Sequence, residues 1–288
     1  MPWGSVIAVE RHWLFSKKRC QRYRPGGIGL CLFPGWCIEG VNPEVWKQGV
    51  NMARLGINIE EVAGLREIRG ALDPDPVTAA VYAEVGGSDG IVVPLRPDLK
   101  PVTERDARFL REMVKSHLTF LVPPVEKLIS AALSLSPDMI TLVPGKKAGT
   151  TPGGGLDVMG HAGDMARLVR DIRDREIVVS LLIEPQIHQV KAAAKVGFDY
   201  VELHMGRYAL ADDLSERADQ LNNIESLAMA ASKMGLGVSA GCGLNYQNVQ
   251  DIAAMAHIEE INIGHAVVSR ALWIGMEAAV RDMAALVH

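Results

Sequence analysis

Glu202 and Cys242 have the residue type and surroundings in this sequence that best suit proton transfer or nucleophilic chemistry. Glu202 interrupts the otherwise apolar run YVELH at residues 200–204, where a carboxylate serves either as an acid or base or as the partner of an interior cation. His204, two residues further on, suits either a proton shuttle or a core histidine. Cys242 stands between two glycines, which fits either a thiol of low pKa at a helix start or a small residue in a tight turn. We therefore take Glu202 and Cys242 as catalytic candidates.

Glycines and arginines that follow other apolar runs predict phosphate binding. Gly243 and Gly264 would let the backbone approach an anion closely, and a helix that begins at His265 would direct its positive end toward that anion. Arg69 and Arg96 could hold another phosphate in a bidentate manner, which predicts two phosphorylated ligands or one bisphosphate. The alternatives are that Arg96 pairs with the nearby Asp98 and that the glycines are ordinary turns. No group of His, Cys, Asp or Glu has metal-ligand spacing, so no metal is expected.

The elements that must position these residues form a regular pattern from residue 52 onward. Short apolar runs alternate with amphipathic segments, which predicts strand–helix units and a parallel sheet. The predicted strands are Arg54–Asn58, Gly90–Pro94, Leu118–Val122, Met139–Val143, Ile177–Ile183, Tyr200–His204, Gly237–Ala240 and Glu260–Ile263. Eight such strands predict a (β/α)8 barrel, the TIM barrel, over residues 52–288, whose active site would lie at the carboxyl ends of the strands.

The alternative architecture is an open, doubly wound sheet. That fold usually has a Gly-x-Gly-x-x-Gly turn after its first strand, whereas this sequence continues with EEV at residues 60–62. Helix signals support the barrel units. Thr103 and Asp106 resemble a capping box before a face formed by Ala107, Leu110, Met113 and Val114. Further helices are predicted over residues 186–196, ending at Gly197, and over residues 246–256.

Composition separates the first fifty residues from the rest of the chain. The 288 residues are 48% apolar and 22% charged with a mean hydropathy of +0.11, enough for a core. The net charge of −4 argues against nucleic-acid binding, and no apolar run is long enough to span a membrane. Residues 1–50 hold four of the five tryptophans and three of the four cysteines. We expect residues 1–51 to be a poorly ordered extension rather than a secretory signal, and the protein to lie in the reducing cytoplasm.

From about Met52 to the C-terminus the sequence resembles the pyridoxine 5′-phosphate synthase family. The resemblance is carried by GINIEEVAGLREIRG, DPDPVTAAVYAEVGGSDGIVVPLR, LVPGKKAGTTPGGGLDV, VELHMGRYA, SAGCGLNYQNV and EINIGHAVVSRA. It implies a barrel enzyme that condenses 3-amino-2-oxopropyl phosphate with 1-deoxy-D-xylulose 5-phosphate to pyridoxine 5′-phosphate, in vitamin B6 biosynthesis. It also implies no metal or organic cofactor, and a homo-oligomer, typically an octamer.

The resemblance assigns substrate-holding roles to residues of this chain. The residues implied to hold the phosphate of the amino ketone are Asn58, Arg69, Gly243, Gly264 and His265. Those implied to hold the phosphate of the deoxyxylulose substrate are Arg96 and Thr151. Glu202 matches the carboxylate that stabilises the transition state.

The positions for proton transfer differ from the family pattern. Pro94, Leu121 and Cys242 stand where the family has histidine, glutamate and histidine; the pair at residues 60–61 replaces Asp-His, and Pro101 replaces a substrate-holding histidine. Each lost acid or base typically costs ~10²–10⁴ in rate. Three functions therefore stay open: an enzyme with family-like condensation in which Glu202, Cys242, His204, Glu60 or Glu61 take new roles, a non-catalytic ligand-binding paralogue, and an enzyme for another reaction on a phosphorylated substrate.

Overall fold

A computed structural model describes residues 52–98, 100–145 and 154–288. The predicted extension over residues 1–51 and the predicted phosphate holder Thr151 lie outside the described residues.

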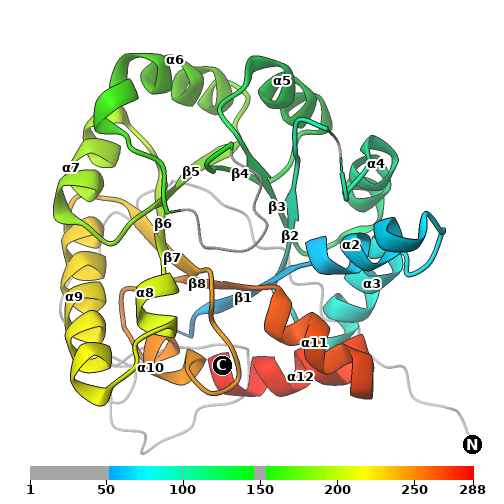
Figure 1. The fold of residues 1–288 in the computed structure, drawn as a ribbon. Coiled ribbons are helices and arrows are strands. Elements are labelled where there is room, and N and C mark those ends of the chain that lie inside the picture. Colours follow the sequence, from blue (N-terminus) through cyan, green and yellow to red (C-terminus); the bar gives the residue numbers. More distant parts are fainter. Residues whose placement is uncertain (1–51, 99, 146–153) are drawn as a thin grey trace, which may run out of the picture. The chain divides into compact units, whose positions relative to one another are not determined.

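Eight parallel strands close into a barrel in sequence order, with helices around it (Figure 1). The strands are β1 (Arg54–Asn58), β2 (Gly90–Pro94), β3 (His117–Val122), β4 (Met139–Leu142), β5 (Val178–Ile183), β6 (Tyr200–His204), β7 (Gly237–Gly241) and β8 (Glu260–Ile263). Pairing of β1 with β8, Ile57 opposite Ile263, closes the ring. The predicted (β/α)8 fold is therefore confirmed, and the open sheet is excluded. Four strands differ by one residue at an end from the prediction.

Helices connect the strands and cover the barrel. They are α2 (Glu60–Arg69), α3 (Pro76–Gly86), α4 (Glu104–Met113), α5 (Glu126–Leu135), α6 (Ala162–Arg173), α7 (Ile187–Val196), α8 (Gly206–Ala209), α9 (Leu214–Lys233), α10 (Val249–Ala253), α11 (His265–Ile274) and α12 (Met276–Val287). A 3-10 turn over Met159–His161 precedes α6. Helices α2 and α11 each begin two residues after the end of the preceding strand, β1 and β8, at the carboxyl end of the barrel.

Two helix predictions need correction, and two are confirmed. The helix predicted over residues 186–196 is α7, with Gly197 as its C-cap. The capping box of Thr103 and Asp106 is present at the start of α4. Met113, placed on the buried face of that helix, is 47% exposed because α4 ends there, while Val114 turns inward. The helix expected over residues 246–256 shortens to α10, because Asn248 uses its side chain to accept from the Asn245 N–H at 2.7 Å and to donate to the Gly243 carbonyl. These bonds hold residues 243–248 as a turn.

The barrel interior is unusually polar, whereas the layer between strands and helices is apolar. Outward-facing residues such as Ile57, Phe120 and Leu181 are fully buried under the helices. Inward-facing positions carry the buried polar side chains Thr119, Thr141, Ser180, Glu202, Ser239, Glu260 and Asn262. At the amino-terminal end Arg54 pairs with Glu260 at 3.0 Å. The barrel interior therefore holds an ion pair at the amino-terminal ends of the strands and polar side chains toward their carboxyl ends.

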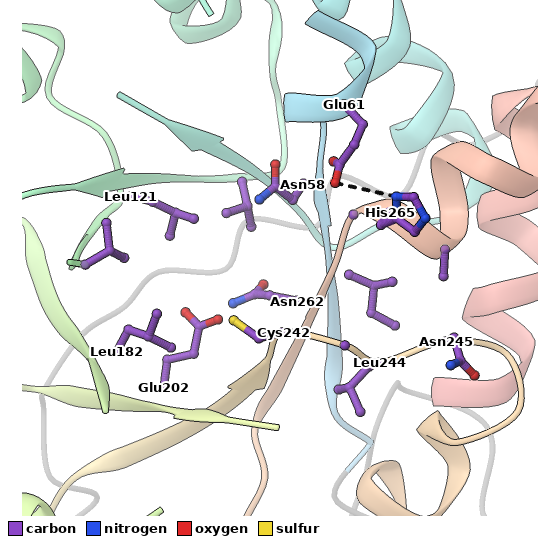
Figure 2. Close-up of a pocket in the computed structure, with 16 residues that line it drawn as sticks. Asn58, Glu61, Leu121, Leu182, Glu202, Cys242, Leu244, Asn245, Asn262 and His265 are labelled. Atoms are coloured by element: carbon purple, nitrogen blue, oxygen red, sulfur yellow. Dashed lines mark ion pairs between the residues drawn. The ribbon is translucent and has the colours of Figure 1, made fainter. Parts of the chain in front are cut away.

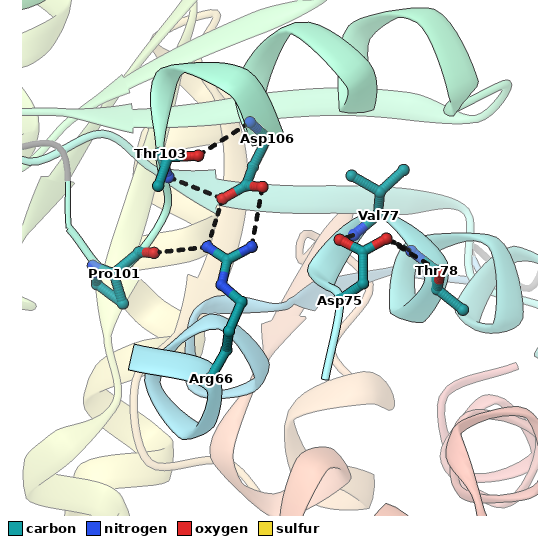
Figure 3. Close-up of polar contacts among 7 residues, drawn as sticks. All are labelled: Arg66, Asp75, Val77, Thr78, Pro101, Thr103 and Asp106. Atoms are coloured by element: carbon teal, nitrogen blue, oxygen red, sulfur yellow. Dashed lines mark hydrogen bonds and ion pairs between the residues drawn. The ribbon is translucent and has the colours of Figure 1, made fainter. Parts of the chain in front are cut away.

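A buried ion pair fixes α2, the helix that follows the first strand, against α4. Arg66 donates to both carboxylate oxygens of Asp106 at 2.9 and 2.5 Å and to the Pro101 carbonyl at 3.0 Å (Figure 3). Burial opposes ionisation of Asp106, but the hydrogen bonds from Arg66 and Thr103 outweigh it and hold the pKa of Asp106 below its usual value. Arg66 therefore has a structural role, because it holds α2 against the start of α4.

Candidate active site

A cavity of about 280 Å³ opens at the carboxyl ends of the strands (Figure 2). Its walls are Asn58, Glu61, Val92, Leu121, Val143, Leu182, Glu202, Cys242, Gly243, Leu244, Asn245, Asn262, Ile263, Gly264, His265 and Ala266. One pocket therefore contains Asn58 and five more of the residues predicted to bind phosphate or to act in catalysis: Glu202, Cys242, Gly243, Gly264 and His265. These five come from β6 and from the segments after β7 and β8. The pocket lies at the end of the barrel where folds of this kind have their active sites.

The pocket wall divides into two parts by strand. Within the described part of the chain, each polar side chain that lines the pocket comes from β1, β6 or β8 or from the segments after β1, β7 and β8. We call this part the polar half. The residues from β2, β3, β5 and the end of β4 are Val92, Leu121, Leu182 and Val143, which we call the apolar half. Figure 2 shows Leu121 and Leu182 on one side and Asn58, Glu61 and His265 on the other.

The amino terminus of α11 forms one wall of the polar half. Gly264 precedes the helix, and Gly264, His265 and Ala266 all line the pocket. The first N–H groups of a helix have no acceptor within the helix, and the helix dipole favours an anion there. A Cβ atom on Gly264 would lie 3.1 Å from both Asn58 Cβ and a carboxylate oxygen of Glu61, so a side chain at this position would narrow the approach. This wall suits one phosphate group.

Glu202 is buried in the same pocket, 5% exposed, and its Oε2 atom has no hydrogen-bond partner among the residues that the structure describes. Burial and then the charge of Glu260 raise the pKa of Glu202 to about 7, although the Asn262 side chain lowers it. Arg54, the arginine inside the barrel, pairs with Glu260. The alternative that Glu202 holds an interior cation is therefore not what the described residues show. A carboxyl that titrates near neutral pH can both give and take a proton.

Cys242 lies in the turn after β7, next to Glu202 in the pocket. Its φ of 71° and that of Gly243, 88°, place both residues in the left-handed region, and α10 begins only at Val249. Burial, followed by the charges of Glu202 and Glu184, raises the pKa of the Cys242 thiol well above its usual value. The interpretation of Cys242 as a low-pKa thiol at a helix start is therefore wrong, and the small residue in a tight turn is what the structure shows.

His204 is 4% exposed and lies outside the pocket wall. The Gly206 N–H donates to its Nδ1 atom at 3.2 Å, and Glu184 Oε1 lies 3.8 Å from the same nitrogen. Burial lowers the pKa of His204, so the ring is neutral with its proton on Nε2. Of its two interpretations, the structure favours the core histidine.

Carboxylates of the pair at residues 60–61 lie beside the predicted phosphate holders. Glu60 accepts from Arg96 Nε at 2.6 Å, so the partner of Arg96 is Glu60 and not Asp98 as the alternative had it. Glu61 Oε1 lies 3.9 Å from His265 Nδ1, and burial raises the pKa of Glu61. Arg69, the last residue of α2, is exposed, and neither arginine lines the pocket. Phosphate binding by Arg69 and Arg96 stays a prediction.

Sequence reasoning missed several residues of the pocket wall. Asn262 interrupts the apolar strand EINI as Glu202 interrupts its own strand, so the same signal was present. Val92 and Leu182 gave no signal, because an apolar residue in a buried strand is expected anyway. In the described residues no three His, Cys, Asp or Glu side chains gather as a metal site, and no helix is long and apolar enough to cross a membrane.

The fold and the pocket define this chain as a parallel (β/α)8 barrel with a small polar pocket at the strand ends and a helix amino terminus in its wall. Residues 55–288 match the model of the family described as pyridoxal phosphate biosynthesis protein PdxJ. The chain belongs to this family.

Curated relatives and solved structures agree with this assignment. The pyridoxine 5′-phosphate synthases of Geotalea daltonii and Geobacter sulfurreducens are each 46% identical over 236 residues, 82% of this chain and 99% of the relative. A solved thiamine phosphate pyrophosphorylase from Pyrococcus furiosus shares 14% identity with a TM-score of 0.53, over 82% of this chain and 96% of that one. The latter likeness concerns the fold alone. The family resemblance of the sequence is thus confirmed.

Proposed function

We propose that this protein binds a small phosphorylated substrate, with the phosphate at Gly264 and His265 and the carbon skeleton over Glu202, which acts as the acid or base. The observation that carries the proposal is the presence of an anion-binding helix start and of a carboxyl with a pKa of about 7 in one small pocket. Asn58, which lies beside Gly264, and Gly243 line the same pocket and would add contacts to the phosphate.

The reaction named for the relatives is pyridoxine 5′-phosphate synthesis, and the family resemblance describes it as condensation of 3-amino-2-oxopropyl phosphate with 1-deoxy-D-xylulose 5-phosphate. That condensation requires several proton transfers. Leu121 and Cys242 line the pocket at positions where the family has proton carriers, and Pro94 lies buried in β2. Glu202 alone cannot serve steps that need separate groups. We therefore propose that this chain belongs to the family reaction class but catalyses the condensation slowly.

A second candidate is a non-catalytic phosphate-ligand-binding paralogue. The apolar half favours it, because Val92, Leu121, Val143 and Leu182 can neither donate nor accept a proton. The two candidates share the phosphate site and differ in whether Glu202 moves a proton. An enzyme diverted to another reaction on a phosphorylated substrate would share with the first candidate both the phosphate site and proton transfer by Glu202.

We also propose that the chain assembles with copies of itself, as the octamers implied by the family do. Side chains on the outer surface of the barrel support this: Ile68, Leu72 and Trp273 are 79%, 81% and 86% exposed. Large apolar side chains that stay exposed on a subunit often become buried in protein interfaces.

The test is an assay of the purified full-length chain with both family substrates, beside the Geobacter sulfurreducens relative. We expect product to form at least about 10²-fold more slowly than with the relative, because three proton carriers are replaced. Glu202→Gln should remove the residual rate. The triple variant Pro94→His, Leu121→Glu, Cys242→His should raise it.

Two outcomes would count against this account. Turnover equal to that of the relative would show that the replaced groups do not limit the reaction. Failure to bind any phosphorylated compound or inorganic phosphate would remove the phosphate site itself. Residual binding without turnover, unchanged in Glu202→Gln, would favour the non-catalytic paralogue.

A further inference from the structure

The apolar half of the pocket offers the ligand few hydrogen-bond partners, in its side chains or in its backbone. Its side chains are aliphatic, and Val92 and Leu182 are 2% and 8% exposed. The carbonyls of Val92, Leu121 and Leu182 already accept from the N–H groups of Ile59, Leu95 and Leu156, at 3.3, 2.9 and 2.8 Å. In the residues described, this wall therefore presents methyl groups to whatever lies against it.

The polar half sets where the charged end of a ligand must lie. Its helix amino terminus at Gly264–His265 suits a phosphate, and Glu202 and Asn262 lie between that end and the aliphatic wall, as Figure 2 shows. A ligand held by its phosphate therefore points its far end toward Leu121 and Leu182. The pocket volume of about 280 Å³ limits this end to a few carbon atoms.

A hydroxyl against this wall would lose its water without gaining a partner among the described residues, whereas an aliphatic or aromatic group would gain by leaving water. One unpaired buried hydroxyl typically lowers affinity by about tenfold or more. 1-Deoxy-D-xylulose 5-phosphate carries such hydroxyls, and Leu121 offers them no hydrogen-bonding side chain.

We infer that the ligand of this pocket is a phosphomonoester whose far end is apolar, a short branched alkyl or an aromatic group rather than a polyhydroxylated chain. The inference rests on the proposed phosphate site and specifies its substrate class. Specificity comes from the aliphatic wall, which leaves hydroxyls unpaired, while the phosphate supplies the common anchor.

The experiment is isothermal titration of the full-length chain with 3-methylbutyl phosphate, benzyl phosphate, 1-deoxy-D-xylulose 5-phosphate and inorganic phosphate. We expect the two apolar esters to bind at least about tenfold more tightly than the deoxysugar phosphate and than inorganic phosphate. The alcohol 3-methylbutanol, which lacks the phosphate, should bind at least tenfold more weakly than its ester.

Two variants of the aliphatic wall distinguish the preference for an apolar far end from the binding of the phosphate. Leu121→Gln and, independently, Leu182→Gln should reduce the preference for the apolar ester about tenfold while inorganic phosphate binds as before. Leu210→Gln, a leucine that is 69% exposed outside the pocket, is the matched control and should leave the preference unchanged. The comparison of ligands on the unchanged chain does not depend on whether either wall variant folds.

Equal or tighter binding of the deoxysugar phosphate by the unchanged chain would overturn the inference and leave the proposed phosphate site intact. An unchanged preference in both folded wall variants would also overturn it. Absence of binding by every phosphate compound, or equal binding of 3-methylbutanol and its ester, would overturn the proposed function itself and the inference with it.

Discussion

The two halves of the pocket have the same position in the barrel and opposite chemistry. The polar half brings Asn58, Glu202, Asn262 and His265 to the strand ends, while the apolar half brings four aliphatic side chains. Both lie on the same closed sheet, so the difference lies in the side chains and not in the scaffold. The difference shows that one closed sheet can present polar and aliphatic side chains to the same pocket, because each half of the wall comes from different strands.

Electrostatics sharpen the same contrast. In the polar half, burial and then the charge of Glu260 disfavour the ionisation of Glu202 and raise its pKa to about 7. In the apolar half no side chain of the wall can ionise. Any pH dependence that the pocket contributes should therefore come from the polar half.

Glu202→Gln is the most severe test of this contrast. Because the folded chain raises the pKa of Glu202 from 4.5 to about 7, the folded state holds this proton more tightly than the unfolded state does. The stabilisation is complete below about pH 4.5 and is lost as the pH rises through 7. At pH 8 the variant should therefore be more stable than the unchanged chain, by up to about 3 kcal/mol, with little difference at pH 4.5.

Denaturant unfolding between pH 4.5 and 8 measures this difference. Glu104→Gln, at an exposed position of α4, is the control and should keep the pH profile of the unchanged chain. Parallel profiles for Glu202→Gln and the unchanged chain would contradict a raised pKa at Glu202.

A pair of glycine substitutions compares the two halves directly. Gly264→Val places its branches against Asn58 and Glu61 at the start of α11 and should weaken inorganic phosphate binding by about 100-fold, or about 2.7 kcal/mol. Gly145→Val, after β4 on the other side, meets only Pro123 Cβ, at 3.6 Å, among the described residues and should leave phosphate binding unchanged. Isothermal titration measures both, with thermal unfolding as the check on folding. An equal loss in both variants would show that the phosphate does not belong to one half.

Much of the fold was predictable because it depends on local patterns. Buried parallel strands read as short apolar runs, and the capping residues of α4 are three positions apart, so both signals are present in the sequence itself. The length of α10 was not predictable, since it depends on how Asn248 bonds to the turn before it.

The candidate site was predictable in several of its residues and in its place at the strand ends, but not in the contacts between those residues. Glu202, Gly264 and His265 were found from their types at strand ends, and the structure brings them into one pocket. The pairing of Arg96 with Glu60 joins residues that follow different strands, so only the closed barrel reveals it. For the same reason, the division into two halves becomes visible only when the order of the strands around the ring is known.

A crystal structure of the full-length chain with 3-methylbutyl phosphate tests the central claim most directly. We expect phosphate density at the backbone N–H groups of His265 and Ala266, beside Asn58, with the alkyl chain against Leu121 and Leu182. Phosphate density on Arg96 or Arg69 instead, or an alkyl chain directed away from the aliphatic wall, would contradict the division of the pocket into a phosphate-holding half and an apolar half.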